Sequence, residues 1–211
     1  MHTACMVKRQ SELRQTQAAR SESTRAALLS AARDLFARHG YAGASSEAIV
    51  AAAGVSRGAL QHHFVDKQSL FLAVYEQVER EVVGATAEAG MEVGQDDPLE
   101  VLRAGCHAYL DAVLDPAVQR ICAIDGPAVL PPDTRNAITD RYALGLVRET
   151  VQLAVERGEI ADAPIEPLTR MLLAAVIAAA QFVATAADTT AARAEAGRTV
   201  DLLLLSLKAP S

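Results

Sequence analysis

The sequence of 211 residues contains no tryptophan, and aromatic residues make up only 4% of it. Runs of β-branched and aromatic residues with the alternation of a half-buried strand are essentially absent. Alanine and leucine supply most of the hydrophobic content, which is 51%, and both favour closely packed helices. The composition therefore predicts an all-α protein.

Cysteine is also scarce, with Cys5, Cys106 and Cys122 alone and no CxxC motif. An odd, sparse set argues against a disulfide framework and favours a reducing compartment. The N-terminal residues lack the apolar core of a signal peptide. The most apolar run, 171–187, is shorter than a membrane span and contains Gln181, which favours a buried helix. We therefore expect a cytoplasmic protein without a membrane partner.

Signatures of catalysis and of cofactor binding are missing as well. The sequence has no recognisable nucleophile turn, no phosphate-binding glycine loop and no HExxH motif. Cys106 and His107 are neighbours on an expected helix and point in different directions, so with Cys122 they make no convincing metal site. We expect no catalytic residues, no cofactor and no bound metal. Redox sensing by Cys106 and Cys122 stays open as an alternative.

Charge is distributed unevenly along a chain whose formal net charge is −6. Residues 1–68 carry nine lysines or arginines against five acidic residues, whereas the remaining residues are strongly acidic. A basic head on an acidic body is typical of a domain that binds a polyanion while the rest of the protein avoids it. An uneven surface charge without a function is the alternative interpretation.

Apolar spacing in the first part of the chain predicts three short helices. They cover 24–39, 46–53 and 56–63. Ser45 can cap the second helix, and Gly54 supplies the sharp turn after it. Residues 1–22 are basic and lack sustained periodicity, so we expect a flexible arm there. Two short helices joined by a turn containing glycine are typical of a helix-turn-helix, whose second helix enters the major groove of DNA.

The start of the third helix, in GVSRGALQHHF, is small and polar enough to approach base edges. Arg57 can form a bidentate pair with guanine, and Ala59 can contact a thymine methyl group. Hydroxyl groups and backbone amides at helix starts suit phosphate oxygens, and Lys67 begins the next helix beside them. The candidate DNA-contacting residues are Ser45, Ser46, Ser56, Arg57, Gly58, Ala59, Gln61, His62 and Lys67.

The rest of the chain is expected to form a larger helical domain. Its helices are predicted over 67–89, 98–113, a short stretch from 116, 133–157, 166–187 and 189–208. Loops are expected over 90–95 and 126–132, the latter because it contains three prolines. Asp97 and Glu100 predict a capping box around Pro98. The last two helices are apolar on more than one face, which predicts pairing with a second copy of the chain.

A pocket for a largely hydrophobic effector is expected between the helices of this second domain. An apolar wall with a few polar groups would suit such a ligand, although each candidate could equally be an ordinary core or surface residue. The candidate lining residues are Cys106, His107, Leu110, Cys122, Asp125, Tyr142, Leu146 and Gln181.

The segment 24–41, followed by AIVAAAGVSRGALQHHFVDKQSLFLAV, resembles the DNA-binding head of the TetR family of bacterial transcriptional repressors. The AGVS turn, the Gly-x-Leu of the third helix and HF-x-x-K-x-x-L carry the resemblance. It implies an all-helical homodimer with a ligand pocket in the larger C-terminal domain, which represses a promoter until an inducer binds. The sequence departs from the family pattern at Gln61, where a phosphate-contacting tyrosine is usual, and at Ala44 and Ser45, where two hydroxyl residues are common.

These observations predict three parts: a flexible arm over 1–22, a helix-turn-helix DNA-binding domain over 23–68, and a ligand-binding and dimerisation domain over 69–211. The resemblance and the residues together predict a ligand-responsive repressor that binds a palindromic operator as a homodimer. A small hydrophobic effector in the C-terminal domain would release it. A redox- or metal-responsive regulator of the same fold, and a helical carrier or enzyme, are the alternatives.

Overall fold

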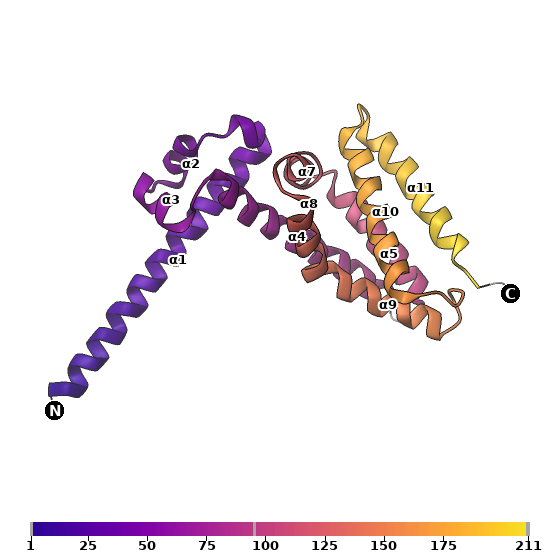
Figure 1. Cartoon of the computed structure of the whole chain (residues 1–211), viewed down its shortest axis with the longest axis horizontal. Helices are drawn as coiled ribbons and strands as arrows, with labels where there is room; N and C mark the ends of the chain where they lie inside the picture. The colour runs from indigo at the N-terminus through magenta and orange to yellow at the C-terminus, as the bar shows by residue number, and fades with distance from the viewer. Residues whose placement is uncertain (1, 95, 210–211) are drawn as a thin grey trace. The chain divides into compact units, whose positions relative to one another are not determined.

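The computed structural model describes residues 2–94 and 96–209, with side chains from residue 17 onward. Within these residues the chain consists of α-helices and two π-helical segments, with no β-strand (Figure 1). The chain divides into two compact units, residues 1–74 and residues 75–211. Helix α4 (Lys67–Val93) begins in the first unit and ends in the second. The predicted all-α class is confirmed.

The first unit opens with α1 (His2–Gly43), which is interrupted at Gly40. The backbone of Gly40 has φ 68, so the helix ends where the sequence analysis expects it to end. Its start differs, because the helix begins at His2 and covers the residues for which we expected a flexible arm. No proline or glycine precedes Gly40, so nothing in the backbone chemistry interrupts the helix. The domain boundaries stay predictions.

The two helices that follow have the predicted positions. α2 (Ser46–Ala53) is capped by Ser45, and α3 (Arg57–His63) is capped by Ser56. Gly54 joins them in a left-handed conformation with φ 65, which a residue with a side chain rarely adopts. Buried apolar side chains from all of these helices form the core of the unit. They include Leu28, Phe36, Ile49, Leu60, Phe64 and Phe71.

The second unit contains the remaining helices. They are α5 (Pro98–Ala112), α6 (Pro116–Val118), η1 (Gln119–Asp125), α7 (Gly126–Val129), α8 (Pro132–Thr139), η2 (Asp140–Leu144), α9 (Gly145–Glu156), α10 (Ile165–Thr185) and α11 (Thr189–Ser206). The segments η1 and η2 are π-helical. α10 packs against α5, α9 and α11, and α11 packs against α5 (Figure 1).

Two predicted loops are helical instead. α4 continues to Val93 through Gly90, which is buried, and a Cβ atom at Gly90 would lie 3.1 Å from Cγ1 of Val101. Glycine at this position lets α5 approach closely, and the loop prediction for 90–95 was wrong up to Val93. Gly126–Val129 forms α7, with Pro127 in the first turn, where its missing N–H leaves no bond unmade. The prediction of an irregular segment from 126 was therefore wrong there too.

The predicted capping box at the start of α5 forms only in part. Asp97 accepts a hydrogen bond from the backbone N–H of Glu100 at 2.9 Å, as expected. The Glu100 carboxylate does not return to Asp97 but accepts two hydrogen bonds from Arg103, each at 2.6 Å. A charged partner one turn away competes successfully for this carboxylate.

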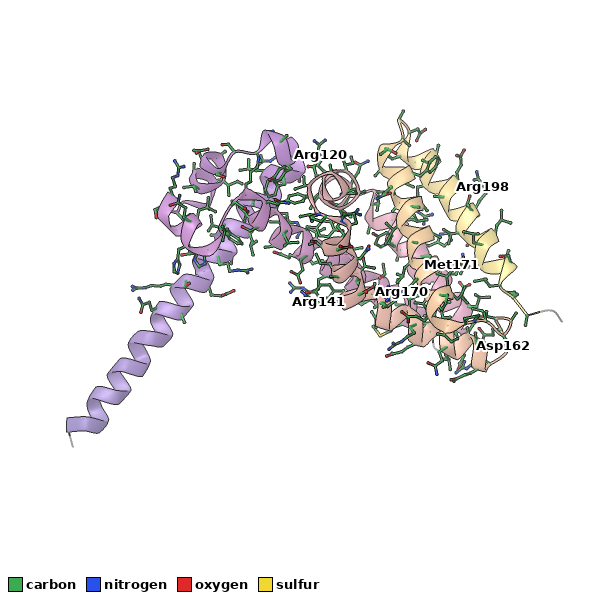
Figure 2. The ribbon with its side chains drawn as sticks, in the orientation of Figure 1. Arg120, Arg141, Asp162, Arg170, Met171 and Arg198 are labelled. Atoms are coloured by element: carbon green, nitrogen blue, oxygen red, sulfur yellow. The ribbon has the colours of Figure 1, made fainter. Side chains whose placement is uncertain are left out.

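Helix α10 is long and apolar enough to cross a membrane by length and composition, so the prediction that this apolar run is shorter than a membrane span was wrong. Such a test is also passed by helices of soluble proteins, so it carries little weight. Only 28% of the apolar window is buried within the chain, and Met171 is 70% exposed (Figure 2). The exposed part of this helix is therefore a large apolar surface that its own chain does not cover.

Candidate nucleic-acid interface and ligand cavity

The exposed face of α3 carries the residues predicted to read DNA bases. Arg57, Gly58, Gln61 and His62 are exposed, and Ala59 is half-buried. The Arg57 guanidinium lies 3.9 Å from the Glu47 carboxylate, and both side chains are more than 70% exposed, at 75% and 71%. An ion pair in this setting contributes little to stability, so Arg57 can exchange Glu47 for another partner.

The predicted serines serve the helix starts in the free protein. The Ser45 hydroxyl accepts a hydrogen bond from the backbone N–H of Ala48 at 3.1 Å, and the Ser56 hydroxyl accepts one from Ala59 at 3.2 Å. Each hydroxyl keeps its own proton, which can still be donated to a phosphate oxygen. Capping and phosphate binding are therefore compatible at both positions.

Lys67 lies in a different setting from the one we expected. Its ammonium group donates hydrogen bonds to the backbone carbonyl oxygens of Tyr41 at 2.8 Å and Ala44 at 3.2 Å. It also lies 4.2 Å from the centre of the Tyr41 ring. Lys67 therefore ties the start of α4 to the end of α1, and its contact with DNA stays a prediction. The sequence pattern does not reveal carbonyl groups contributed from residues more than twenty positions away.

Four of the predicted DNA-contacting residues lie together along one groove of about 290 Å³ in the first unit. They are Ser46, Arg57, Gln61 and Lys67. The exposed apolar side chain of Val65 lines the same groove and is 94% exposed. Sequence reasoning missed Val65, although an apolar residue between two polar helix ends is a recognisable signal.

The second unit contains a partly open cavity of about 400 Å³. Its wall is built mainly by apolar side chains from α4, α5, α8, α9 and α10, and this size and lining are typical of small-molecule sites. Cys106, Tyr142 and Leu146 line it, so the structure brings together three of the predicted pocket residues. Their contact with a ligand stays a prediction.

The other predicted pocket residues lie outside the cavity wall. Leu110 is a fully buried core residue, and Cys122 is also buried. The Asp125 carboxylate accepts a hydrogen bond from Nε of Arg120 at 3.2 Å. Gln181 is half-buried on α10 and does not line the cavity either. Helical spacing placed these residues on inward faces but could not tell which inward face borders the cavity.

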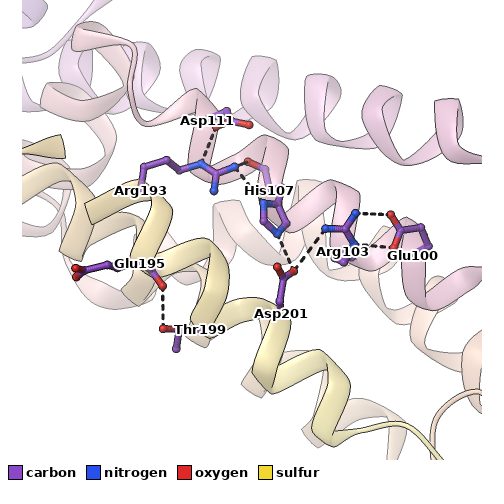
Figure 3. Close-up of polar contacts among 8 residues, drawn as sticks. All are labelled: Glu100, Arg103, His107, Asp111, Arg193, Glu195, Thr199 and Asp201. Atoms are coloured by element: carbon purple, nitrogen blue, oxygen red, sulfur yellow. Dashed lines mark hydrogen bonds and ion pairs between the residues drawn. The ribbon is translucent and has the colours of Figure 1, made fainter. Parts of the chain in front are cut away.

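His107 belongs to a polar network between α5 and α11 (Figure 3). Its Nε2 lies 2.8 Å from Oδ1 of Asp201, and its Nδ1 lies 3.1 Å from Nη2 of Arg193. Arg193 also donates to the Asp111 carboxylate at 2.6 Å. The hydrogen bond from His107, which stabilises the charged form, holds the pKa of Asp201 below its usual value. The network joins α11 to α5, which gives His107 a structural role.

Glu79 is a buried acidic residue of the cavity wall that sequence reasoning missed. Burial raises the pKa of its carboxyl group, although hydrogen bonds with Tyr75 and Cys122 act in the opposite direction. Burial also raises the pKa of Tyr75 and Tyr109. Glu79 follows Tyr75 by one helical turn on an otherwise apolar face, which is a signal that could have identified it.

Two observations bear on the redox and metal alternatives. Burial raises the pKa of the Cys106 thiol to about 11, so the thiol stays protonated at neutral pH, and the protonated form reacts slowly with oxidants. Among the side chains of residues 17–94 and 96–209, no group of three or more histidine, cysteine, aspartate or glutamate residues could hold a metal ion.

A helix-turn-helix with an exposed recognition helix, followed by a helical unit that contains an apolar cavity, defines the class of DNA-binding regulators with a ligand-binding domain. Comparisons with known families agree. Residues 28–74 match the family described as bacterial regulatory proteins of the tetR family. Residues 99–207 match the tetracyclin repressor-like C-terminal domain.

Individual relatives show the same pattern. The transcriptional repressor AcnR of Corynebacterium glutamicum is 41% identical over 69 residues, which span 33% of this chain and only 37% of AcnR. The regulator CymR of Pseudomonas putida is 30% identical over 134 residues, which span 62% of this chain and 66% of CymR. AcnR thus matches over about a third of its own length.

Solved structures extend the likeness to most of the chain. A TetR-family transcriptional regulator from Pectobacterium atrosepticum has a TM-score of 0.79 and 32% identity, with 91% of this chain and 97% of that chain covered. RolR in complex with resorcinol has a TM-score of 0.63 at 21% identity, with 92% and 98% covered, and shares the fold. The chain therefore belongs to the TetR family of transcriptional regulators.

Proposed function

We propose that this chain is a ligand-responsive repressor that binds a palindromic operator as a homodimer and is released by a small, largely hydrophobic effector. The observation that carries the proposal is the 400 Å³ apolar cavity in a chain that also has an exposed recognition helix. The related protein AcnR is named a repressor, which supports repression over activation for this chain. A ligand in the related fold of RolR supports the use of a cavity. A regulator of this kind acts in the cytoplasm.

The apolar surface of α10 and α11 supports the homodimer. Large apolar side chains are exposed on both helices, which a soluble monomer rarely tolerates over a continuous area. They are Met171, Phe182, Leu202, Leu203 and Leu205, and each is at least 44% exposed. A second copy of the same helices would cover them by two-fold symmetry, since such an interface is self-complementary. Two heads then bind two half-sites about one helical turn of DNA apart, or a multiple of that spacing.

Helix α4 supplies the route from effector to DNA. It starts at Lys67, separated from the end of the recognition helix by three residues, and its residues Glu79, Val83 and Met91 line the cavity. An effector that repositions α4 therefore changes the spacing of the two heads. Coupling of this kind is typically about 1–3 kcal/mol, which weakens operator binding by roughly 5–150-fold.

Recovery of genomic DNA fragments by the purified protein, followed by mobility-shift titration, tests the proposal. Arg57→Ala should relax the sequence preference at one base pair and cost about 1–3 kcal/mol in operator binding. Arg148→Ala, at an exposed arginine on α9 outside the proposed dimer surface, is the matched control and should bind the operator like the unmodified protein. Equal operator affinity for the Arg57 variant and the unmodified protein would remove α3 from the interface. Failure to retain any fragment at about 50–100 mM salt would contradict DNA binding itself.

A further inference from the structure

The cavity wall has an uneven charge composition. Glu79 and Glu149 are its charged residues, and no lysine, arginine or histidine lines it within the part of the chain that the structure describes. The other lining residues are apolar or carry an uncharged hydroxyl or thiol group. A ligand with a negative charge would therefore meet two acidic groups and no positive partner. The wall suits neutral or positively charged ligands instead.

Glu79 lies in an environment that leaves its negative charge without a positive partner. The groups that act on it are the hydroxyl of Tyr75 on α4 and the thiol of Cys122 on η1. Tyr109 on α5 is buried nearby, and its pKa is raised partly by the Glu79 charge. None of these groups is a cation; Arg135 on α8 acts on the neighbouring Tyr75 but is not among the groups that act on Glu79. A buried carboxylate without a cationic partner is strongly disfavoured, because its charge has lost most of its hydration.

We propose, on the basis of the function proposed above, that the effector is a lipophilic cation: an ammonium compound with an apolar body whose positive nitrogen pairs with the Glu79 carboxylate. The apolar wall would cover the body of the ligand, and the charged nitrogen would supply the partner that Glu79 lacks. The rings of Tyr109 and Tyr142 line the same cavity and attract cations through their negative faces. The Tyr142 hydroxyl donates to Oε1 of Glu76 at 2.8 Å, which fixes its ring in the wall.

This pairing has a defined pH dependence. Burial raises the pKa of Glu79 in the free protein, and a bound cation would lower it again, so cation binding favours the ionised carboxylate and releases a proton. Affinity for a permanent cation should therefore rise with pH until Glu79 is ionised in the free protein. Tyr75 and Tyr109 stay protonated over the same range because burial raises their pKa values.

Calorimetric titration of the purified full chain with three probes of similar shape tests the proposal. The probes are phenyltrimethylammonium, its neutral isostere tert-butylbenzene, and phenylacetate as the anion. We expect the cation to bind at least about tenfold more tightly than the neutral probe, because an interaction with a charged group commonly contributes an affinity gain of that size. The anion should bind most weakly. The affinity of the cation should rise with pH as Glu79 ionises, whereas that of the neutral probe should stay constant.

The variant Glu79→Gln separates a charge effect from a packing effect, because it keeps the volume and removes the charge. It should bring the affinity for the cation to within about threefold of that for the neutral probe and abolish the pH dependence. Glu149→Gln is the matched control: Glu149 lines the same cavity but is exposed, so its loss should change the affinity less than about threefold. If Glu79→Gln does not fold, the three probes and the pH series on the unmodified protein still decide.

Two results would overturn the proposal: a neutral or anionic probe that binds as tightly as the cation, or a cation affinity that Glu79→Gln leaves unchanged. The mobility-shift assay distinguishes this failure from failure of the proposed function. Retention of operator DNA without preference for the cation would refute the effector class alone. Absence of any DNA binding by the unmodified protein would refute the proposed repressor function itself.

Discussion

Gly126 offers a quantitative test of how tightly the second unit is packed. A Cβ atom at this position would lie 2.6 Å from Cε2 of Tyr75 and 3.1 Å from the backbone oxygen of Ile121. Real Cβ atoms essentially never approach another atom as closely as the first of these distances. The Tyr75 ring cannot move away easily because the residue is only 5% exposed. Gly126→Ala therefore forces either the ring or the helix to shift.

The expected size of the effect follows from two opposing contributions. Gly126 has φ −51, so alanine is compatible with its backbone and would gain roughly 1 kcal/mol of helix propensity. Overpacking of a buried site typically costs about 1–3 kcal/mol, and the rigid ring places this site near the upper end. We expect a net destabilisation of roughly 1–2 kcal/mol.

Urea unfolding followed by circular dichroism measures this effect, with the variants compared at one protein concentration. Gly145→Ala is the matched control, because Gly145 is also helical, with φ −61, and nothing lies within 4 Å of its added Cβ atom. It should raise the midpoint, as expected for a stabilisation of roughly 0.5–1 kcal/mol, while Gly126→Ala lowers it. Midpoint shifts of the same sign in both variants would refute the argument from packing.

Three further predictions concern the head and the polar network. Gly58→Ala should stabilise the protein by roughly 0.5–1 kcal/mol, because the nearest atom to an added Cβ is Oγ of Ser56 at 3.9 Å. The same variant should weaken operator binding. Thermal unfolding and mobility shift would show these opposite signs. Lys67→Met should lower the free energy of unfolding by about 1–3 kcal/mol, because two carbonyl groups lose their donor, whereas Arg57→Met should leave it nearly unchanged. The pKa of Asp201 is lower in the folded protein than its ordinary value of 3.8, so the ionised carboxylate stabilises the fold when the pH is above 3.8. This contribution disappears as the pH falls through the lowered pKa. Asp201→Asn should therefore reduce the acid-induced loss of stability in a pH series of unfolding curves.

The helix-turn-helix could be predicted closely because its signals are local. The hydroxyl of Ser45 and the left-handed backbone of Gly54 act on atoms within a few residues of themselves. Such interactions depend little on the rest of the fold, so the bounds of α2 agree with the prediction. The same locality explains the start of α5 after Asp97.

The predictions that failed depend on contacts between distant segments. Gly90 resembles a loop residue in the sequence but lies where α5 approaches α4, and Gly126 fits beside the ring of Tyr75. The setting of Lys67 was likewise hidden from the sequence, because the carbonyl groups of Tyr41 and Ala44 come from distant positions, although its contact with DNA stays a prediction. Periodicity identifies an inward face, but only the packed structure shows which part of that face borders a cavity.

The π-helical segment η2 gives the cavity a marker that can be recognised in other sequences. A π-helical turn contains one residue more than the α-helical turn it replaces, so removal of that residue would rotate the following helix by about 100°. Tyr142 and Ala143 of η2 line the cavity, and α9 continues the wall directly after them. A relative that is one residue shorter between 139 and 145 would therefore present different side chains to its ligand. A single-residue gap in an alignment at this point would separate subgroups with different effector chemistry.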